Sequence, residues 1–215
     1  MAATPDPAPP RRATYRHGNL RPALLDAAVG LAAEGGPAAV SLREVTRRAG
    51  VAPNAAYRHF ADRDALVHAV SMAAMAEVAA RMEAEQAAVP ATADPATRAR
   101  ARFRAVGTGY LGYAVAEPGL FRAAFHTPAD MTHAADDTAA GEQGLTPFEI
   151  LGAALDGLVD AGLLPPERRP GAEFLAWSAV HGLAVLMIDG PLRGITPAQA
   201  HTAGQDVISM VERGL

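Results

Sequence analysis

Residues 41–66 read SLREVTRRAGVAPNAAYRHFADRDAL, and this stretch decides the fold. Ser41 followed by Glu44 has the pattern of a capping box, which opens a short helix. Gly50 ends that helix and is expected to adopt a positive φ, which side chains resist. Pro53 suits the first turn of a second helix. Two short helices joined by a tight turn are typical of the helix-turn-helix, whose second helix enters the major groove of DNA.

Helical patterns continue on both sides of this stretch. Apolar residues recur three and four positions apart, and Gly, Pro and capping residues separate the periodic segments. The predicted helices cover residues 20–34, 42–49, 53–59, 63 into the eighties, 95–116, 119–125, 147–161, 171–189 and 196–213. Because no strand pattern alternates along the chain, we predict an all-α fold with an N-terminal three-helix helix-turn-helix head and a C-terminal helical bundle.

Composition excludes several classes of protein. The chain has no cysteine, which excludes disulfides, thiolate zinc sites and iron–sulfur clusters. It has no nucleophile elbow, HExxH, phosphate-binding loop or dinucleotide fingerprint, so we expect no catalytic residues, no cofactor and no enzyme. No apolar run reaches the ~18 residues of a membrane span, and Met1–Arg12 lacks the apolar segment of a secretory signal. We therefore expect no membrane partner and a cytoplasmic location.

Charge is unevenly distributed along the chain. All 19 basic residues are arginine, and the net charge is −4. Residues 1–63 hold nine arginines and five acidic residues, whereas residues 64–215 hold ten arginines and eighteen acidic residues. A basic N-terminal third on an acidic body indicates that one end of the molecule meets a polyanion.

Two segments carry a resemblance to a known family. Residues 15–70 resemble the DNA-binding domain of TetR-like (tetracycline-repressor-like) transcriptional regulators. The matching residues are the Ser41 start, Ala49-Gly50-Val51, Tyr57-Arg58-His59-Phe60, and Asp62-Arg63-Asp64 before Leu66. In the C-terminal part, Trp177, His181 and Gly182, followed by Asp189-Gly190, resemble the ligand-domain type named for its Trp–His–Gly signature.

The resemblance implies a ligand-responsive, sequence-specific regulator of transcription, expected to be a repressor that a small molecule releases from a palindromic operator. The chain would divide into a disordered arm at 1–14, a helix-turn-helix domain at 15–63, and a ligand-binding and dimerisation domain at 64–215. The implied partners are double-stranded operator DNA, a small and mainly apolar effector, and a second copy of the chain bound through the last two helices.

The candidate DNA-binding residues surround the second helix of the motif. They are Ser41, Arg43, Pro53, Asn54, Ala55, Tyr57, Arg58, His59 and Arg63. Asn54 can pair bidentately with adenine, and the Ala55 methyl can meet a thymine methyl. The resemblance places Tyr57, His59 and Arg63 on phosphates. In the alternative interpretation, the aromatic residues of the motif are core and its arginines form a solvated face.

Two features flank the motif. Arg11, Arg12 and Arg16 either follow the DNA backbone or minor groove as an arm, or form a solvated tail. Ala52 stands where the family usually has Ser or Thr, so the second helix lacks a side-chain cap worth ~1 kcal/mol.

An aromatic group in the C-terminal part is the candidate effector pocket. Trp177 and His181 lie one turn apart in the segment 171–189, which is apolar nearly all round and is therefore expected to be buried on two sides. The candidate ligand-binding residues are Phe103, Tyr110, Phe121, Phe125, Trp177 and His181. Val106 and Tyr113 are further candidates for the lining. In the alternative interpretation, His181 is a hydrogen-bonded core histidine and the aromatic residues are core packing.

Further patterns are weaker. The loop 126–145 carries His126, Asp130, His133, Asp136 and Asp137. An alanine-rich loop holds no coordination geometry, so we expect no metal there. Arg98, Arg100, Arg102 and Arg104 are expected to form a solvated face. Two other functions stay open: a constitutive DNA-binding architectural protein, and a small all-helical enzyme that uses histidines and carboxylates for acid–base chemistry.

Overall fold

The computed structural model describes residues 20–91, 94–126 and 137–215, and these residues form helices and no strands. The helices are α1 (Leu20–Gly35), η2 (Pro37–Ala39), α2 (Leu42–Arg48), α3 (Pro53–Ala56), α4 (Arg63–Ala87), α5 (Pro95–Ala116), α6 (Pro118–Ala124), η4 (Asp137–Ala139), α7 (Pro147–Asp160), η5 (Pro166–Arg168), α8 (Ala172–Ile188) and α9 (Pro197–Gly214). The predicted all-α fold is confirmed. The predicted arm at 1–14, and Asp130, His133 and Asp136 of the loop, lie outside the described residues.

Capping side chains start the helices where the sequence predicts. The hydroxyl of Thr146 caps α7 and that of Thr196 caps α9, each in a reciprocal capping box. Asp62 caps α4 by accepting a hydrogen bond from the Ala65 N–H at 2.8 Å. At α2 only half of the predicted box forms. Ser41 Oγ accepts from the Glu44 N–H at 3.3 Å, but the Glu44 carboxylate pairs with Arg47 instead of reaching back.

The second helix of the motif is shorter than predicted. α3 covers Pro53–Ala56 and residues 57–59 form a turn, whereas the sequence suggested a helix to residue 59. The predicted absence of a side-chain cap at Ala52 is observed. A one-turn helix without a side-chain cap is only weakly stabilised, so it does not extend further. Instead, the N–H groups of His59 and Phe60 both donate to the Ala56 carbonyl and form a turn.

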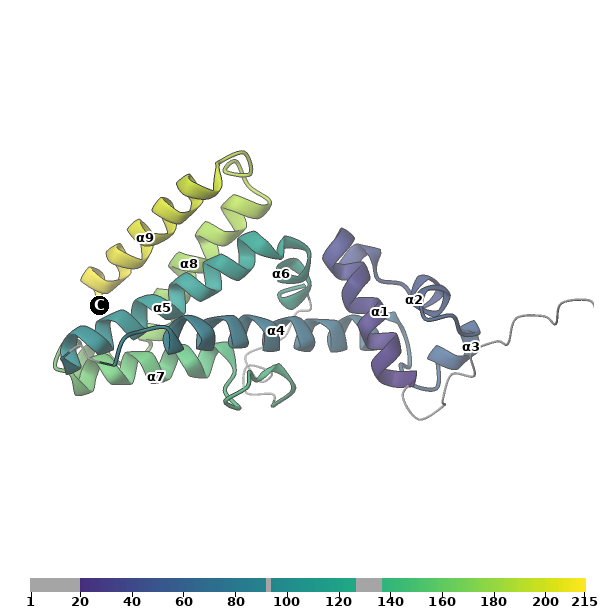
Figure 1. Ribbon diagram of the computed structural model, residues 1–215, viewed down its shortest axis with the longest axis horizontal. Coiled ribbons are helices and arrows are strands. Elements are labelled where there is room, and N and C mark those ends of the chain that lie inside the picture. Colours follow the sequence, from purple (N-terminus) through teal and green to yellow (C-terminus); the bar gives the residue numbers. More distant parts are fainter. Residues whose placement is uncertain (1–19, 92–93, 127–136) are drawn as a thin grey trace, which may run out of the picture.

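The head has its own small core. Leu24, Ala28, Val45 and Ala56 are fully buried between α1, α2 and α3. Gly50 adopts the expected left-handed conformation, with φ +69°, and turns the chain between α2 and α3. Figure 1 shows this head at one end of the molecule, with α4 running from it into the helices of the body.

α4 is the central helix of the structure. It packs against α1 and α6 near the head and against α5 and α7 farther along. At its crossing with α5 the backbones nearly touch: a Cβ on Gly109 would lie 2.8 Å from Met82 Cα. Within the described residues, α4 is the one helix long and apolar enough to cross a membrane, contrary to the expectation from the sequence; half of its most apolar stretch is buried in this fold.

A buried carboxylate also ties α4 to the segment before α7. Glu83 is only 6% exposed, and it accepts hydrogen bonds from the backbone N–H groups of Glu142 at 2.9 Å and Gln143 at 3.1 Å. These bonds compensate the burial of the charge. α4 therefore has the contacts of a core helix.

A polar network holds α9 on α5. Arg104 donates to Glu212 at 2.9 Å, Ser209 at 3.0 Å and Gln205 at 3.1 Å, and Arg100 pairs with Glu212 at 2.7 Å. The expectation of a solvated face was wrong for Arg104, which is half-buried against α9; Arg100 is exposed as expected, but its charge is paired. Their partners lie about a hundred residues away in the chain and could not be read from local spacing.

The outer face of α8 is bare in the single chain. Phe174, Leu175, Val185 and Leu186 are 50%, 65%, 42% and 43% exposed. The predicted burial of α8 on two sides is therefore observed on one side only; on the second side Phe174 packs against Phe148 of α7 at 5.6 Å between ring centroids, and all four side chains stay largely exposed within the described chain.

Candidate functional site

The N-terminal candidate site is a convex surface at the tip of the head. Pro53 and Asn54 of α3 are exposed, and so are Tyr57, Arg58 and His59 in the turn that follows. Tyr57 is 58% exposed, so its alternative interpretation as core was wrong. Ala55 is half-buried, and the Ser41 hydroxyl is occupied by its capping bond to Glu44.

Phe60 anchors this surface from beneath. Its side chain is 3% exposed, and the Arg21 guanidinium carbon lies 5.2 Å from its ring centroid. This residue is core, as the alternative interpretation had it. The turn at 57–59 thus sits on a buried aromatic ring, which fixes the exposed side chains relative to α3.

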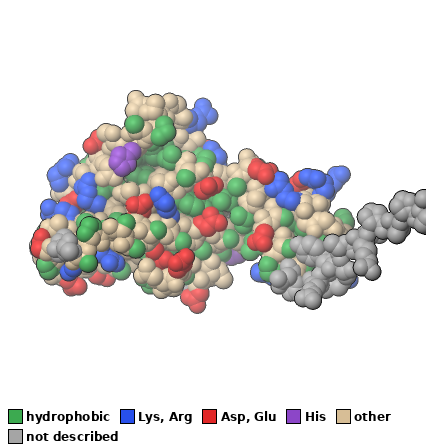
Figure 2. Space-filling model, viewed as in Figure 1, with side chains coloured by type: hydrophobic (Ala, Val, Ile, Leu, Met, Phe, Trp, Pro, Cys, Tyr) green, Lys and Arg blue, Asp and Glu red, His purple; other side chains and the backbone are tan. Residues whose placement is uncertain are grey.

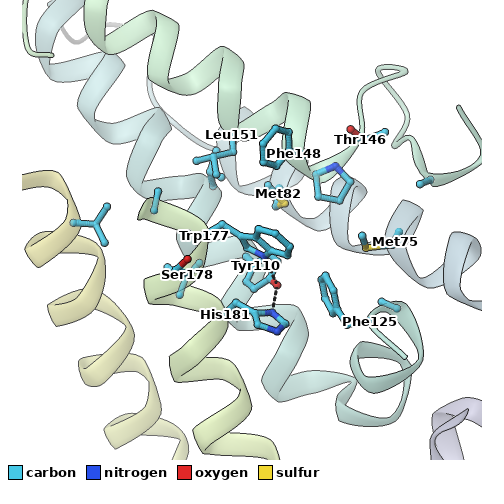
Figure 3. Close-up of a pocket in the computed structure, with 18 of the residues that line it drawn as sticks. Met75, Met82, Tyr110, Phe125, Thr146, Phe148, Leu151, Trp177, Ser178 and His181 are labelled. Carbon is cyan, nitrogen blue, oxygen red and sulfur yellow. Dashed lines mark hydrogen bonds between the residues drawn. The ribbon is translucent and has the colours of Figure 1, made fainter. Parts of the chain in front are cut away.

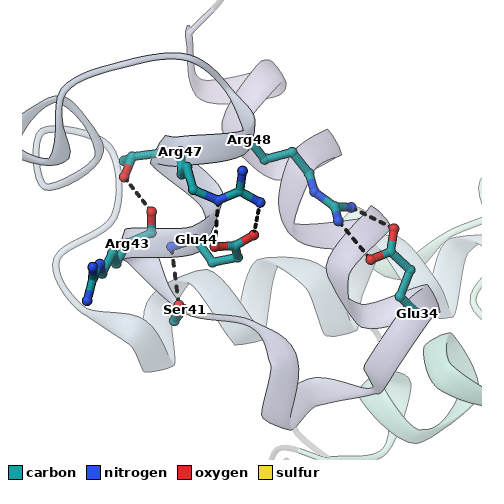
Figure 4. A network of polar contacts seen from close by, with 7 residues as sticks. Glu34, Ser41, Arg43, Glu44, Arg47 and Arg48 are labelled. Carbon is teal, nitrogen blue, oxygen red and sulfur yellow. Dashed lines mark hydrogen bonds and ion pairs between the residues drawn. The ribbon is translucent and has the colours of Figure 1, made fainter.

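The arginines of the head differ in how far their charge is neutralised. Figure 4 shows Arg47 paired with Glu44 and Arg48 paired with Glu34, the latter through bonds of 2.9 and 2.7 Å. Arg43 and Arg58 are exposed and make no ion pair within the described part of the head. Arginine side chains gather over this end of the molecule in Figure 2.

Arg63 is partly committed to the fold. Its Nε donates to the Val40 carbonyl at 2.9 Å, and a terminal nitrogen donates to the Pro37 carbonyl at 2.7 Å. The guanidinium therefore fastens the start of α4 to the chain between α1 and α2. Its predicted phosphate contact stays a prediction, and the other terminal nitrogen lies 3.9 Å from the Asp64 carboxylate.

A second candidate site is a cavity of about 410 Å³ in the body. Residues of α4, α5, α7, α8 and α9 line it (Figure 3). The apolar lining includes Met72, Met75, Met82, Phe103, Val106, Phe125, Phe148, Leu151, Ile208 and Val211. None of the lining residues in the described part of the chain carries a charged side chain. Its size and apolar walls are those of a small-molecule pocket.

Three residues form a polar chain on one wall of the cavity. Trp177 Nε1 donates to the Tyr110 hydroxyl at 3.2 Å, and the same hydroxyl lies 2.8 Å from His181 Nδ1. Burial raises the pKa of the Tyr110 phenol, so the hydroxyl stays protonated and needs an acceptor. Burial lowers the pKa of His181, which keeps the imidazole neutral. The tyrosine O–H therefore donates to Nδ1, and the imidazole proton resides on Nε2.

Aromatic rings pack around this chain. Phe125 meets His181 edge-on at 4.7 Å between centroids, and Phe121 stacks with His181 at 5.7 Å and packs against Phe125 at 4.9 Å. Phe121 does not line the cavity, contrary to the prediction. It borders a second, shallower hollow of about 360 Å³ between α6, α8 and Pro37 of the head. Phe125 and His181 line both spaces and form the wall between them.

Most, but not all, of the residues predicted to line the cavity do so. Phe103, Val106, Tyr110, Phe125, Trp177 and His181 come together around the cavity. Tyr113 does not, because its hydroxyl donates to Glu77 at 2.9 Å on the α4 side of α5. Within the described residues, no three metal-ligating side chains come together, and His126 and Asp137 join no such cluster.

Comparisons with known proteins agree with this architecture. The model for the family described as "Tetracyclin repressor-like, C-terminal domain" matches residues 103–211, about half of the chain. The model for "Bacterial regulatory proteins, tetR family" matches residues 24–70. The protein belongs to the TetR family. This membership explains why an exposed helix-turn-helix and an apolar cavity occur in one small chain.

Several solved structures share the fold. A protein of unknown function from Rhodococcus sp. RHA1 is 27% identical, with a TM-score of 0.72 over 95% of this chain and 99% of that one. A TetR-family regulator from Pectobacterium atrosepticum is 22% identical, with a TM-score of 0.61 over 91% of both chains. PfmR, a TetR-family regulator from Thermus thermophilus, is 20% identical, with a TM-score of 0.56 over 89% of this chain and 95% of that one. No curated protein matches.

Sequence reasoning missed part of the cavity of this TetR-family protein. Met72, Met75 and Met82 of α4 and Phe148 and Leu151 of α7 line it, together with two residues of α9. Apolar spacing marks all of them as buried, but spacing does not say which buried residues surround empty space. The resemblance to the Trp–His–Gly type itself stays a prediction.

Proposed function

We propose that this TetR-family regulator is a repressor that binds a palindromic operator as a homodimer and releases it when a small, mainly apolar effector enters the cavity. The observation that carries the proposal is the continuity of α4. Arg63 at its first turn is bonded to the head, and Met72, Met75 and Met82 farther along line the cavity. A constitutive architectural protein would need no such cavity.

The two parts of the chain that α4 connects would have separate roles. Residues 15–63 would bind DNA, and residues 64–215 would bind the effector and the second subunit. Members of a family of soluble DNA-binding regulators act where the chromosome is, so we infer a cytoplasmic location.

The exposed tip of the head supports operator binding. Asn54 is exposed at the first turn of α3, where an amide can pair with an adenine edge in the major groove. We expect a selection from random DNA duplexes to enrich a palindrome whose half-sites lie about one helical turn, ~34 Å, apart or a multiple of it. Asn54→Ala should change the base preference within each half-site and keep the spacing. A selection that enriches no sequence would contradict operator recognition.

The unpaired arginines of the head support phosphate contacts. We expect Arg43→Ala and Arg58→Ala each to weaken binding to all DNA sequences alike and to lower the slope of log affinity against log salt by about one. Arg48→Ala is the matched control, because its charge is already paired with Glu34. Affinity measured from about 50 to about 300 mM salt decides the matter. If Arg48→Ala lowers the slope as much as Arg43→Ala does, the assignment of the phosphate contacts to the unpaired arginines is wrong.

The bare face of α8 supports dimerisation. Four large apolar side chains are exposed there, and Gly182 lies between them in the helix, where a Cβ would meet nothing in the single chain. α9 lies beside α8 and exposes Met210. Two such faces brought together would form a four-helix contact with the small residue allowing close approach. TetR-family regulators usually function as homodimers, and this face is the proposed interface.

α6 offers a second mechanical connection between the cavity and the head. Phe125, at its C-terminal end, lines the cavity. Gly119, near its N-terminus, packs directly against the carbonyl oxygens of Ala32 and Ala33 at the end of α1. An effector shifts only an equilibrium whose two states it binds unequally. We propose that these states differ in how α4 and α6 hold the head, with a coupling of ~1–3 kcal/mol.

A further inference from the structure

We propose that the cavity takes an uncharged, largely apolar molecule with one hydrogen-bond acceptor, a carbonyl oxygen, which the Nε2–H of His181 receives. The inference rests on the proposed function, since it names the chemical class of the effector. It goes beyond the apolar character of the pocket because it specifies the ligand's charge and its one polar group.

The first argument concerns the hydrogen-bonding side chains that line the cavity and the partners they already have. The Trp177 N–H and the Tyr110 hydroxyl are used within the chain that ends at His181 Nδ1. Thr146 is occupied as well, because its hydroxyl donates to the Glu149 carboxylate at 2.9 Å and caps α7. Ser178 lies where the lining is exposed to solvent. Among the described lining residues other than the exposed Ser178, the imidazole N–H is thus the side-chain donor left to a ligand, and a donor seeks an acceptor.

The second argument is the absence of charge. Among the described residues that line the cavity there is no Asp, Glu, Lys or Arg. A carboxylate or ammonium group would lose its hydration on entry and find no opposite charge. The neutral imidazole does not supply one, because burial lowers the pKa of His181. A carbonyl loses less hydration and recovers its one hydrogen bond from Nε2–H.

The third argument is the packing around the imidazole. Phe125 and Phe121 pack against His181 and against each other, and Tyr110 fixes its Nδ1. The ring therefore cannot swing to meet a different group without breaking a partly buried hydrogen bond. At the packing density of protein interiors, a cavity of about 410 Å³ accommodates about 300 Å³ of molecule. This is the space for a ring with an alkyl chain.

The test uses three probes of one shape: 4-hexylacetophenone, 4-hexylbenzoate and 1-hexyl-4-isopropylbenzene. They differ only in whether the head group is a ketone, a carboxylate or a hydrocarbon. Calorimetric titration of the protein without DNA should give an affinity for the ketone at least ~10-fold above that for the carboxylate. In His181→Phe, the ketone should lose about tenfold in affinity while the hydrocarbon keeps its own. Comparing the affinity that the ketone loses with the affinity that the hydrocarbon loses on this substitution isolates the contribution of the hydrogen bond.

Tyr110→Phe provides a second variant that keeps the imidazole. Without the tyrosine hydroxyl either ring nitrogen can carry the proton, so the ketone should lose affinity by a smaller factor than in His181→Phe, again with the hydrocarbon unchanged. Benzoate binding as tightly as the ketone, His181→Phe lowering all three affinities equally, or none of the probes binding would each overturn the proposal. Operator affinity is measured separately. If the protein binds its operator but prefers the benzoate, the proposed ligand class is wrong and the proposed function stands. If it binds the ketone but no operator, the proposed function is wrong and the ligand class stands.

Discussion

Replacing Leu175 by arginine is expected to leave a folded monomer whose operator affinity is lower by about 10²–10⁴-fold. Leu175 is 65% exposed on the outer face of α8, so the change costs little within one chain and places a charge in the proposed dimer interface. In a dimer the second head binds its half-site intramolecularly, and this gain is what a monomer loses. Sedimentation velocity measures the assembly, and DNA titration measures the affinity.

Two comparisons control this prediction. Ala153→Arg adds the same charge at an exposed position of α7 and should change neither assembly nor affinity. Gly157 in α7 and Gly182 in α8 are both open to a Cβ within the single chain. Gly157→Ala should therefore stabilise the helix by ~0.5–1 kcal/mol, whereas Gly182→Ala should weaken the dimer. A Leu175→Arg protein that remains dimeric would locate the interface elsewhere.

Local signals predicted the helices well because helix ends are local events. Asp62, Thr146 and Thr196 each cap a helix that begins within one residue of its predicted start. Gly50 turns the chain where a side chain would be strained. These features involve neighbours three or four residues apart, so spacing alone reveals them.

Features that depend on distant partners could not be predicted in this way. Arg63 has the position of a phosphate contact, yet its donors bind carbonyls more than twenty residues away. Phe121 and Phe125 are four residues apart on α6 and its end, but only Phe125 reaches the cavity. The packing of several helices decides which aromatic side chains border the cavity. The spacing of apolar residues along the sequence does not contain this information.

The exposed face of α8 illustrates a different limit. A helix that is apolar nearly all round predicts burial on two sides, and this reasoning is sound. It does not say whether the second cover comes from the same chain or from another copy. Leu175 and Leu186 are exposed in the single chain because no described element reaches them. The sequence thus indicated an interface, and the structure showed which face is free for it.

Gly119→Ala is expected to lower the free energy of unfolding by ~1–3 kcal/mol and to weaken operator binding in the absence of any effector. A Cβ at this position would overlap the carbonyl oxygens of Ala32 and Ala33. These atoms are backbone and cannot move aside, so α6 must withdraw from the end of α1, at the cost typical of overpacking. Elsewhere in a helix the same substitution would be stabilising.

The displacement matters because α6 joins the two candidate sites. Its far end, at Phe125, forms the wall between the cavity and the hollow beside the head. A forced retreat at Gly119 should therefore reproduce part of the change that an effector causes from the Phe125 end, and the variant should respond less to added effector. Chemical denaturation and operator titration, with Gly157→Ala as the matched control, measure both effects. If Gly119→Ala stabilises the protein as the control does, then α1 and α6 are not in contact in solution. If it destabilises the protein and leaves operator affinity unchanged, α6 supports the head without setting its position, and α4 alone carries the coupling.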